Sequence, residues 1–199
     1  MKKLFFLLCL LPLLASYSFA QESRQDVSIS AVGTFQPTVT GNGYTQTSTL
    51  GKGGLVGYRF MLTPSSAIEG NYQYSRFDFK YVGSGPLKGR IHTSLQEESV
   101  AYVHSFVYKK FNPFAEVGAG LLTFRPIDDT GTTLNFGSNT RAYAALFGGG
   151  IAYQLSPSWD LRVQYRALLF KSVTFGIPQF GTNRYYIAQQ PAIGFAYHF

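Results

Sequence analysis

The sequence predicts an all-β protein, an eight-stranded antiparallel transmembrane β-barrel with up-and-down order that follows a cleaved signal peptide. Three observations predict it. Charged residues make up only 14% of the chain and aromatic residues 17%, whereas a soluble domain carries about 25% charge. Apolar and polar residues alternate with the period of a strand in segment after segment. The connections between these segments alternate between long polar loops and short turns, as in outer-membrane barrels.

The first 20 residues have the organisation of a secretory signal peptide. Lys2 and Lys3 precede an apolar run over 4–14, and Ser18-Phe19-Ala20 places small residues where a signal peptidase cleaves. We therefore expect residues 1–20 to be the signal peptide and residues 21–199 to form one barrel domain. Cleavage lowers the net charge from +7 to +5 and removes Cys9, the single cysteine of the chain. The mature chain then has no disulfide, catalytic thiol or cysteine-ligated metal.

The first half of the barrel domain contains four predicted strands. Strand one covers 27–35 and ends before Pro37, and a polar loop over 38–49 leads to strand two at 53–62. After a turn at 63–66, strand three starts at Ala67 and places Ile68, Tyr72 and Tyr74 on one face. Its apolar face then changes parity at Phe77, which predicts a bulge near Ser75–Arg76 or a departure from the membrane. Strand four covers 92–108, and its phase stays open because both parities contain apolar residues.

The second half contains the other four strands. A turn at 109–113 precedes strand five at 115–121, and a polar loop over 126–140 precedes strand six at 142–155. A turn at 156–158 leads to strand seven at 160–169, where apolar and polar residues alternate without exception. A last loop at 171–182 leads to strand eight, which runs to Phe199. An even number of strands with long external loops and short periplasmic turns places both termini in the periplasm.

The last strand has an apolar face that ends in aromatic residues. Ile193, Phe195, Tyr197 and Phe199 fall on one face, and Gly194 precedes the aromatic residues. Such a face would cause aggregation at the edge of a soluble sheet, but it is stable against lipid in a closed barrel. The ending resembles the C-terminal signature of bacterial outer-membrane β-barrels, and this resemblance implies that Gly194, Tyr197 and Phe199 form the assembly signal.

The polar face of the strands should point into the barrel. An eight-stranded barrel is only wide enough for side chains to fill, so its buried charges must pair. One interpretation is a static polar plug, and the other is a gate in which Glu69 or Glu116 exchanges arginine partners. The expected lumen residues are Arg59, Glu69, Asn71, Gln73, Glu116, Arg162, Gln164 and Arg166.

The alternating strands, the pattern of long and short connections and the Gly194/Tyr197/Phe199 ending resemble the small OmpA-like and OmpX-like bacterial outer-membrane barrels. The resemblance covers residues 21–199. It implies folding by the outer-membrane assembly machinery, which reads the last strand. It also implies a monomer without cofactors that acts in envelope structure or in surface interaction with an unknown extracellular ligand. A narrow porin-like channel for small solutes is the first alternative.

A lipid A-modifying enzyme is the second alternative. His92 and Ser94 lie two residues apart and share one strand face, a spacing similar to that of the PagL lipid A deacylase. No third catalytic member is identified, and Glu97 and Glu98 are only nearby. We therefore expect no enzymatic activity. We also expect no metal site, because the histidines and carboxylates lack a metal-ligand spacing.

Basic residues outnumber acidic ones near the predicted external side. They are expected either to bind phosphates of lipopolysaccharide or to provide ordinary loop solubility. Nucleic-acid binding is disfavoured because the basic residues are scattered and the protein is exported. The basic residues concerned are Lys52, Lys80, Lys88, Arg90, Arg141, Lys171 and Arg184.

Overall fold

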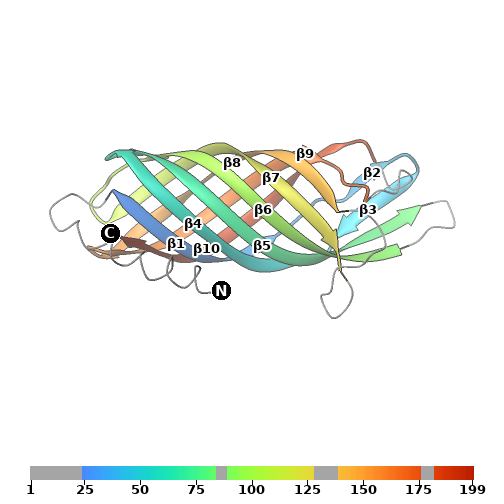
Figure 1. Cartoon of the computed structure of the whole chain (residues 1–199), viewed down its shortest axis with the longest axis horizontal. Helices are drawn as coiled ribbons and strands as arrows, with labels where there is room; N and C mark the ends of the chain where they lie inside the picture. Colours follow the sequence, from blue (N-terminus) through green and yellow to red (C-terminus); the bar gives the residue numbers. More distant parts are fainter. Residues whose placement is uncertain (1–23, 84–88, 128–138, 176–181) are drawn as a thin grey trace, which may run out of the picture.

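A computed structural model of the chain describes residues 24–83, 89–127, 139–175 and 182–199. The predicted signal peptide, residues 1–20, lies outside these residues. The described part is a closed, elongated β-barrel (Figure 1). Its barrel strands are β1 (Gln25–Thr34), β4 (Gly51–Thr63), β5 (Ser66–Gly83), β6 (Gly89–Ser105), β7 (Phe111–Pro126), β8 (Thr140–Ser156), β9 (Trp159–Lys171) and β10 (Tyr185–His198).

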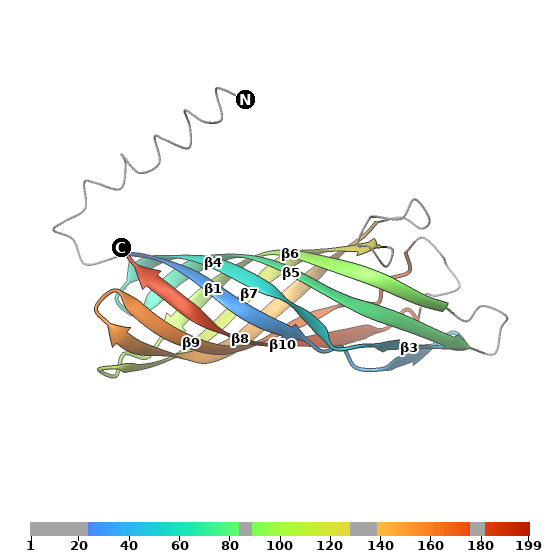
Figure 2. The ribbon, with the colours of Figure 1, turned by 90° about the horizontal axis from the view of Figure 1, so that it is seen from below.

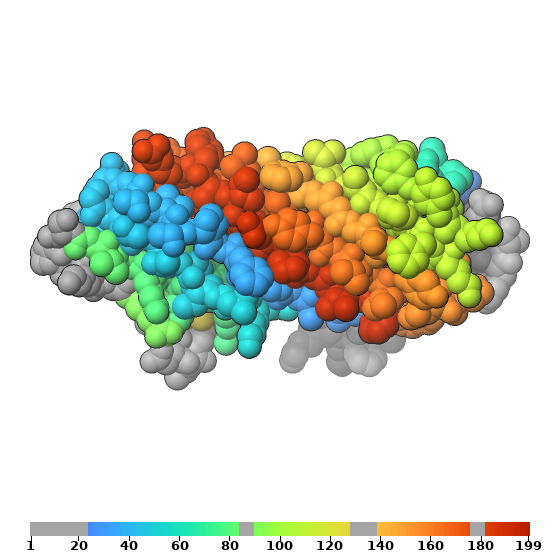
Figure 3. Space-filling model, turned by 180° about the vertical axis from the view of Figure 1, so that it is seen from behind, coloured from blue at the N-terminus to red at the C-terminus, as the bar shows by residue number. Residues whose placement is uncertain are grey.

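Each barrel strand pairs antiparallel with its neighbours. The first strand, β1, pairs with β10 from Asp26↔His198 to Val32↔Ala192, and the pairing of β5 with β6 completes the ring. Strands β1 and β10 lie side by side in the wall (Figure 3). The predicted eight-stranded antiparallel barrel is thus confirmed. Within the described residues, there is no helix with the length and hydrophobicity needed to cross a bilayer.

The two ends of the barrel differ. One end, which we call the terminal end, carries the start of β1, the last residues of β10 and the short connections (Figures 1 and 2). The other, the loop end, carries the longer connections and the outer halves of β5 and β6. Strands of 17 and 18 residues exceed the about 9–11 residues that a tilted strand needs to cross a bilayer.

The polar segment over 38–49, predicted as a loop, contains a small hairpin. Strands β2 (Val39–Gly41) and β3 (Tyr44–Ser48) pair with each other, and β3 also pairs with the outer part of β5. The two residues between them, Asn42 and Gly43, have φ angles of 51° and 79°. Two consecutive positive φ values are typical of the tight turn that an Asn-Gly pair forms between antiparallel strands.

The predicted bulge in strand three does not exist. Strand β5 pairs with β6 without a register shift from Ser66↔His104 to Tyr81↔Gly89. Its inward positions keep one parity but change from polar to aromatic at Phe77. The apolar residues do change parity as predicted, but not through a bulge, because the inward face itself becomes apolar toward the loop end.

The structure resolves the open phase of strand four. In β6 the odd-numbered residues from Thr93 to Val103 point inward, and Val100 and Tyr102 point outward. The strand ends at Ser105 rather than at residue 108. The next strand, β7, begins at Phe111 and includes Pro113, which was predicted to lie in the turn.

Candidate functional site in the barrel lumen

The lumen near the terminal end contains a group of two arginines and two carboxyl side chains, which we call the Arg59–Arg162 cluster. Arg59 Nε donates a hydrogen bond to Glu69 Oε2 over 2.6 Å, and Arg162 Nη2 donates to both carboxylate oxygens of Asp26 over 3.2 Å. Arg162 also lies 3.7 Å from Glu69. All four side chains are at most 3% exposed. Each cation therefore contacts two anions, which offsets the cost of removing them from water.

An aromatic ring forms one wall of this cluster. The guanidinium carbons of Arg59 and Arg162 lie 5.0 and 5.9 Å from the ring centroid of Phe114. A cation over an aromatic face gains further electrostatic stabilisation where water is excluded. The cluster thus has both ionic and aromatic partners.

The second group surrounds Arg166, which is fully buried, and we call it the Arg166 cluster. Arg166 Nη2 donates to Glu97 Oε1 over 2.6 Å and to Ser99 Oγ over 3.0 Å. Its Nη1 donates weakly to Gln190 and Gln73 at 3.4 and 3.5 Å. Gln190 Nε2 donates to the second oxygen of Glu97 over 3.1 Å. The side chains come from β5, β6, β9 and β10, so the cluster ties opposite walls of the barrel together.

Glu116 is the exception in this network. Its Oε1 lies 3.7 Å from Arg166 Nε, and neither carboxylate oxygen has a hydrogen-bond partner among the described residues. A Cβ atom at Gly148 would lie 2.7 Å from that oxygen, so glycine provides the space for the carboxylate. Within the two clusters four carboxylates face three arginines, and Glu116 is the carboxylate in excess.

Toward the loop end the lumen is filled by aromatic and aliphatic side chains. The ring of Phe79 is the centre of this aromatic core. Its centroid lies 5.1–6.2 Å from the ring centroids of Phe77, Phe175, Tyr81 and Phe124. Leucines of β6, β7, β8 and β9 pack against these rings. The described residues thus line the bore with polar side chains toward the terminal end and with apolar side chains toward the loop end.

The eight lumen residues expected from the sequence all lie inside and are at most 7% exposed. Six belong to the two clusters or contact them. The amide groups of Asn71 and Gln164 have atoms without a hydrogen-bond partner in the described part of the chain. The sequence missed Asp26, Glu97 and Gln190. Glu97 lies in the strand of open phase and Asp26 lies just before the predicted start of strand one. Gln190 alternates with the apolar residues of β10 and could have been found from the pattern.

The predicted His92–Ser94 pair lies on the outside of β6. His92 Nδ1 is 2.6 Å from Asp78 Oδ1, and Arg90 also donates to Asp78. Asp78 lies on β5 beyond the lipid-facing residues, where partial burial opposes its ionisation but hydrogen bonds from Arg90 and His92 lower its pKa below the usual value. Ser94 is only 4% exposed, and its hydroxyl donates to the Arg125 carbonyl over 3.5 Å. Asp78 is a third polar partner that the sequence did not indicate, but Ser94 is buried.

The residues expected to form the assembly signal lie at the seam between β1 and β10. Gly194 is paired with Ser30 and points inward, and a Cβ atom there would lie 2.0 Å from the Ile29 carbonyl oxygen. Tyr197 points outward and stacks on Phe199 with a centroid distance of 6.2 Å. The glycine therefore permits the close approach of the first and last strands.

Three solved structures with similar folds are small barrels of the outer membrane or the cell surface. Neisserial surface protein A is 14% identical over 89% of this chain and 98% of its own, with a TM-score of 0.60. OprG of Pseudomonas aeruginosa is 12% identical over 90% of this chain and 97% of its own, with a TM-score of 0.59. Ail, the attachment invasion locus protein of Yersinia pestis, solved with the heparin analogue sucrose octasulfate, is 17% identical over 88% and 99%, with a TM-score of 0.51.

A comparison with curated proteins gave no match. The sequence model described as "Outer membrane protein beta-barrel domain", however, matches residues 6–199. This match covers every described strand and agrees with the resemblance predicted from the strand pattern. The chain belongs to the outer membrane protein β-barrel family, and its place is the bacterial outer membrane.

Proposed function

We propose that the protein is a non-enzymatic component of the outer membrane that acts through its outer wall and external loops. Its loop end faces the cell exterior and its termini face the periplasm after export and signal cleavage. The observation that supports this proposal is the burial of the inward side chains. Two buried polar clusters and an aromatic core occupy successive levels of the bore, so the surface is the part of the molecule that remains for interaction.

Planar-bilayer conductance tests this function. The wild-type barrel should give no discrete current steps, and the Glu116→Ala variant should be equally silent. The removal of one carboxylate leaves the Arg166–Glu97 pair and the aromatic core in place. Discrete current steps from the wild type would contradict the proposal that the lumen is closed.

A narrow channel is the second candidate, and the position of Glu116 favours it. Arg166 already lies 3.7 Å from Glu116, so a small rotation could exchange Glu97 for Glu116 as its main partner. Such an exchange would move charge across the bore and could open a water path. If the wild type conducts, Glu97→Ala should raise the open fraction and Glu116→Ala should lower it. Equal effects of the two substitutions would exclude this gate.

We also infer that the outer-membrane assembly machinery recognises β10 through its outward aromatic residues. The inference is supported by the exposure of Tyr197 and Phe199 on the lipid side of the seam. Phe199→Ala should reduce the amount of barrel assembled in cells but leave refolding of the purified protein in detergent unchanged. If both decrease together, Phe199 has a role in barrel stability instead.

A further inference from the structure

Three basic residues form one row across the outside of four adjacent strands, and we call them the basic row. Lys52 of β4 is directly opposite Arg76 of β5, and Ser94 of β6 connects Arg76 to Arg125 of β7 in the same register. Like charges directly opposite each other destabilise a sheet. No described acidic residue forms an ion pair with any of the three.

A second pair of like charges farther toward the loop end shows the contrast. Lys80 and Arg90 are also directly opposite, but Arg90 bonds to Asp78 beside it. The repulsion there is compensated within the chain. Among the described residues nothing compensates the repulsion in the basic row, which points to an anion from outside.

The basic row stands where the lipid-facing surface ends. On the side of the terminal end, which we call below the row, the outward residues of β5 are Ile68, Gly70, Tyr72 and Tyr74, and Arg76 is the next outward position. Arg76 Nε donates to the Tyr74 hydroxyl over 2.8 Å, and its guanidinium carbon lies 5.5 Å from the centroid of that ring. Tyrosine side chains mark the membrane–water interface, and cations just beyond it lie at the depth of lipid phosphates.

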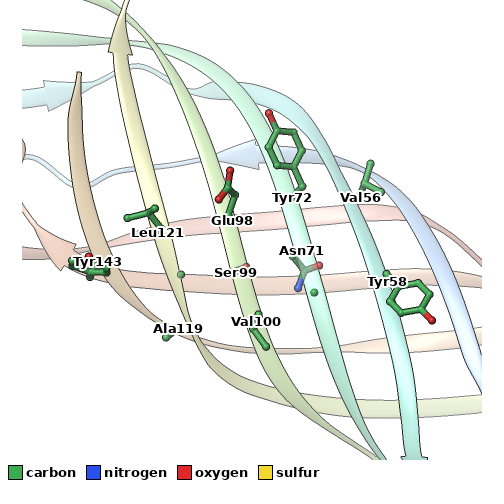
Figure 4. Close-up of a pocket in the computed structure, with 12 residues that line it drawn as sticks. Val56, Tyr58, Asn71, Tyr72, Glu98, Ser99, Val100, Ala119, Leu121 and Tyr143 are labelled. Atoms are coloured by element: carbon green, nitrogen blue, oxygen red, sulfur yellow. The ribbon is translucent and has the colours of Figure 1, made fainter. Parts of the chain in front are cut away.

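A groove opens in the wall directly below the basic row (Figure 4). It has a volume of about 640 Å³ and is lined mainly by apolar atoms. Its floor is formed by small residues, Gly70 of β5 and Ala119 of β7, between larger neighbours such as Tyr72 and Leu121. A Cβ atom at Gly70 would meet no atom within 4 Å. The groove is therefore an open depression in the lipid-facing wall.

Glu98 lies between the basic row and the groove floor. It is exposed on the outside of β6, opposite Tyr72 of β5 and Leu121 of β7 (Figure 4). A carboxylate on the lipid face of a barrel is unfavourable unless a polar group meets it. Along the wall the order is thus cations, a hydrogen-bond acceptor that lines the groove, and the apolar groove floor.

This order matches the parts of a phosphorylated glycolipid. We propose that the wall of β4–β8 binds one such lipid of the outer leaflet, with its phosphate on the basic row. Its sugar hydroxyl or amide groups donate to Glu98, and one acyl chain lies in the groove. The small headgroup of a simple phospholipid offers Glu98 fewer donors than the sugar of a glycolipid does. The proposal rests on the proposed orientation of the loop end toward the exterior.

Native mass spectrometry of the purified barrel in detergent tests the site, with bisphosphorylated lipid A as the probe. The wild type should form a one-to-one complex, and Arg76→Gln should weaken it at least about tenfold because charge-assisted bonds to phosphate are lost. Lys110→Gln, which removes an exposed charge from the turn before β7, is the control and should bind like the wild type.

The groove has its own matched pair of variants on one strand. Ala119→Leu fills the groove and should weaken lipid A binding, whereas Ala115→Leu places the same side chain on the lipid face of β7 outside it. The heat-dependent shift of the folded barrel on electrophoresis shows that each variant is folded. Equal binding of Ala119→Leu and Ala115→Leu would overturn the groove assignment.

Two further results would overturn the proposal. Equal affinity for phosphatidylglycerol would show that the sugar is not recognised, and a barrel dimer that Ala119→Leu abolishes would assign the groove to a second copy. Weaker binding of dephosphorylated lipid A would support it. Conductance is measured without lipid A, so a failure of this site leaves the test of the filled lumen independent.

Discussion

Replacement of Arg166 by methionine is the most direct test of the lumen network. The side chain is fully buried and holds Glu97 at 2.6 Å, with Ser99 as a further partner. Methionine replaces the unbranched part of arginine as far as Nε, so the substitution keeps the packing of that part and removes the guanidinium charge with its hydrogen bonds. It leaves Glu97 buried without its main cation and raises the excess of carboxylates over arginines in the clusters from one to two. We expect a loss of about 3–5 kcal/mol of unfolding free energy.

A second substitution tests the charge argument itself. Glu97→Gln in the Arg166→Met background restores the excess of one carboxylate, because one anion and one cation are then both absent. The double variant should recover at least half of the loss. Arg141→Met, which removes an exposed arginine of β8, is the control and should cost less than about 1 kcal/mol.

Urea unfolding in detergent micelles, followed by tryptophan fluorescence and by electrophoretic mobility of the folded barrel, measures these changes. The reasoning is refuted if Arg166→Met costs no more than Arg141→Met. It is equally refuted if the double variant is no more stable than the single one, since the loss would then come from packing and not from an uncompensated charge.

Three other expectations follow from the geometry. Glu116→Gln should change the unfolding free energy by less than about 1 kcal/mol, because both oxygens of Glu116 already lack hydrogen bonds, and the same urea titration measures it. Gly194→Ala should cost about 1–3 kcal/mol through the contact with the β1 backbone, whereas Gly54→Ala, whose nearest atom is 4.0 Å away, should be neutral. His92→Ala should leave lipid A acylation in cells unchanged by mass spectrometry, because Ser94 is buried, and a loss of deacylated lipid A would identify an enzyme.

The number and order of the strands could be predicted because the membrane imposes a simple rule on each wall position. In β9 every second residue from Leu161 to Leu169 takes an outward position, where Ala167 is covered and the others are accessible, and every residue between them faces the lumen. The pairing of each strand with the next then follows from the short and long connections. The fold is therefore encoded in local alternation, which a single sequence reveals.

The same rule fails beyond the membrane. At Phe77 of β5 the parity of the apolar residues changes although the strand continues without a bulge. Outside the bilayer the wall faces water, so Arg76 and Asp78 point outward and aromatic side chains form the core. Nothing in the parity of one strand distinguishes this inversion from a shift of register. The Asn42-Gly43 turn, in contrast, carried a recognised hairpin signal in the sequence and could have been predicted.

The partners within the lumen depend on register and closure, which the sequence does not give. Arg162 meets Asp26, which is 136 positions away in the chain, because β9 faces β1 across β10. The sequence identified the buried arginines from alternation but assigned only two acids to them. The two missing acids, Asp26 and Glu97, changed the network from an excess of arginines to an excess of carboxylates.

The inversion in β5 also locates the membrane boundary independently of the basic row. Below Arg76 the wall is apolar outside and polar inside, and above it the two faces are exchanged. Only the wall toward the terminal end has an apolar outer surface that needs lipid around it. At the loop end the aromatic side chains are buried inside the barrel. The barrel therefore emerges from the bilayer at the level where Lys52, Arg76 and Arg125 lie side by side. Since the inversion is read from the inward side chains and the basic row from the outward ones, their agreement places the uncompensated cations at the depth of lipid phosphates.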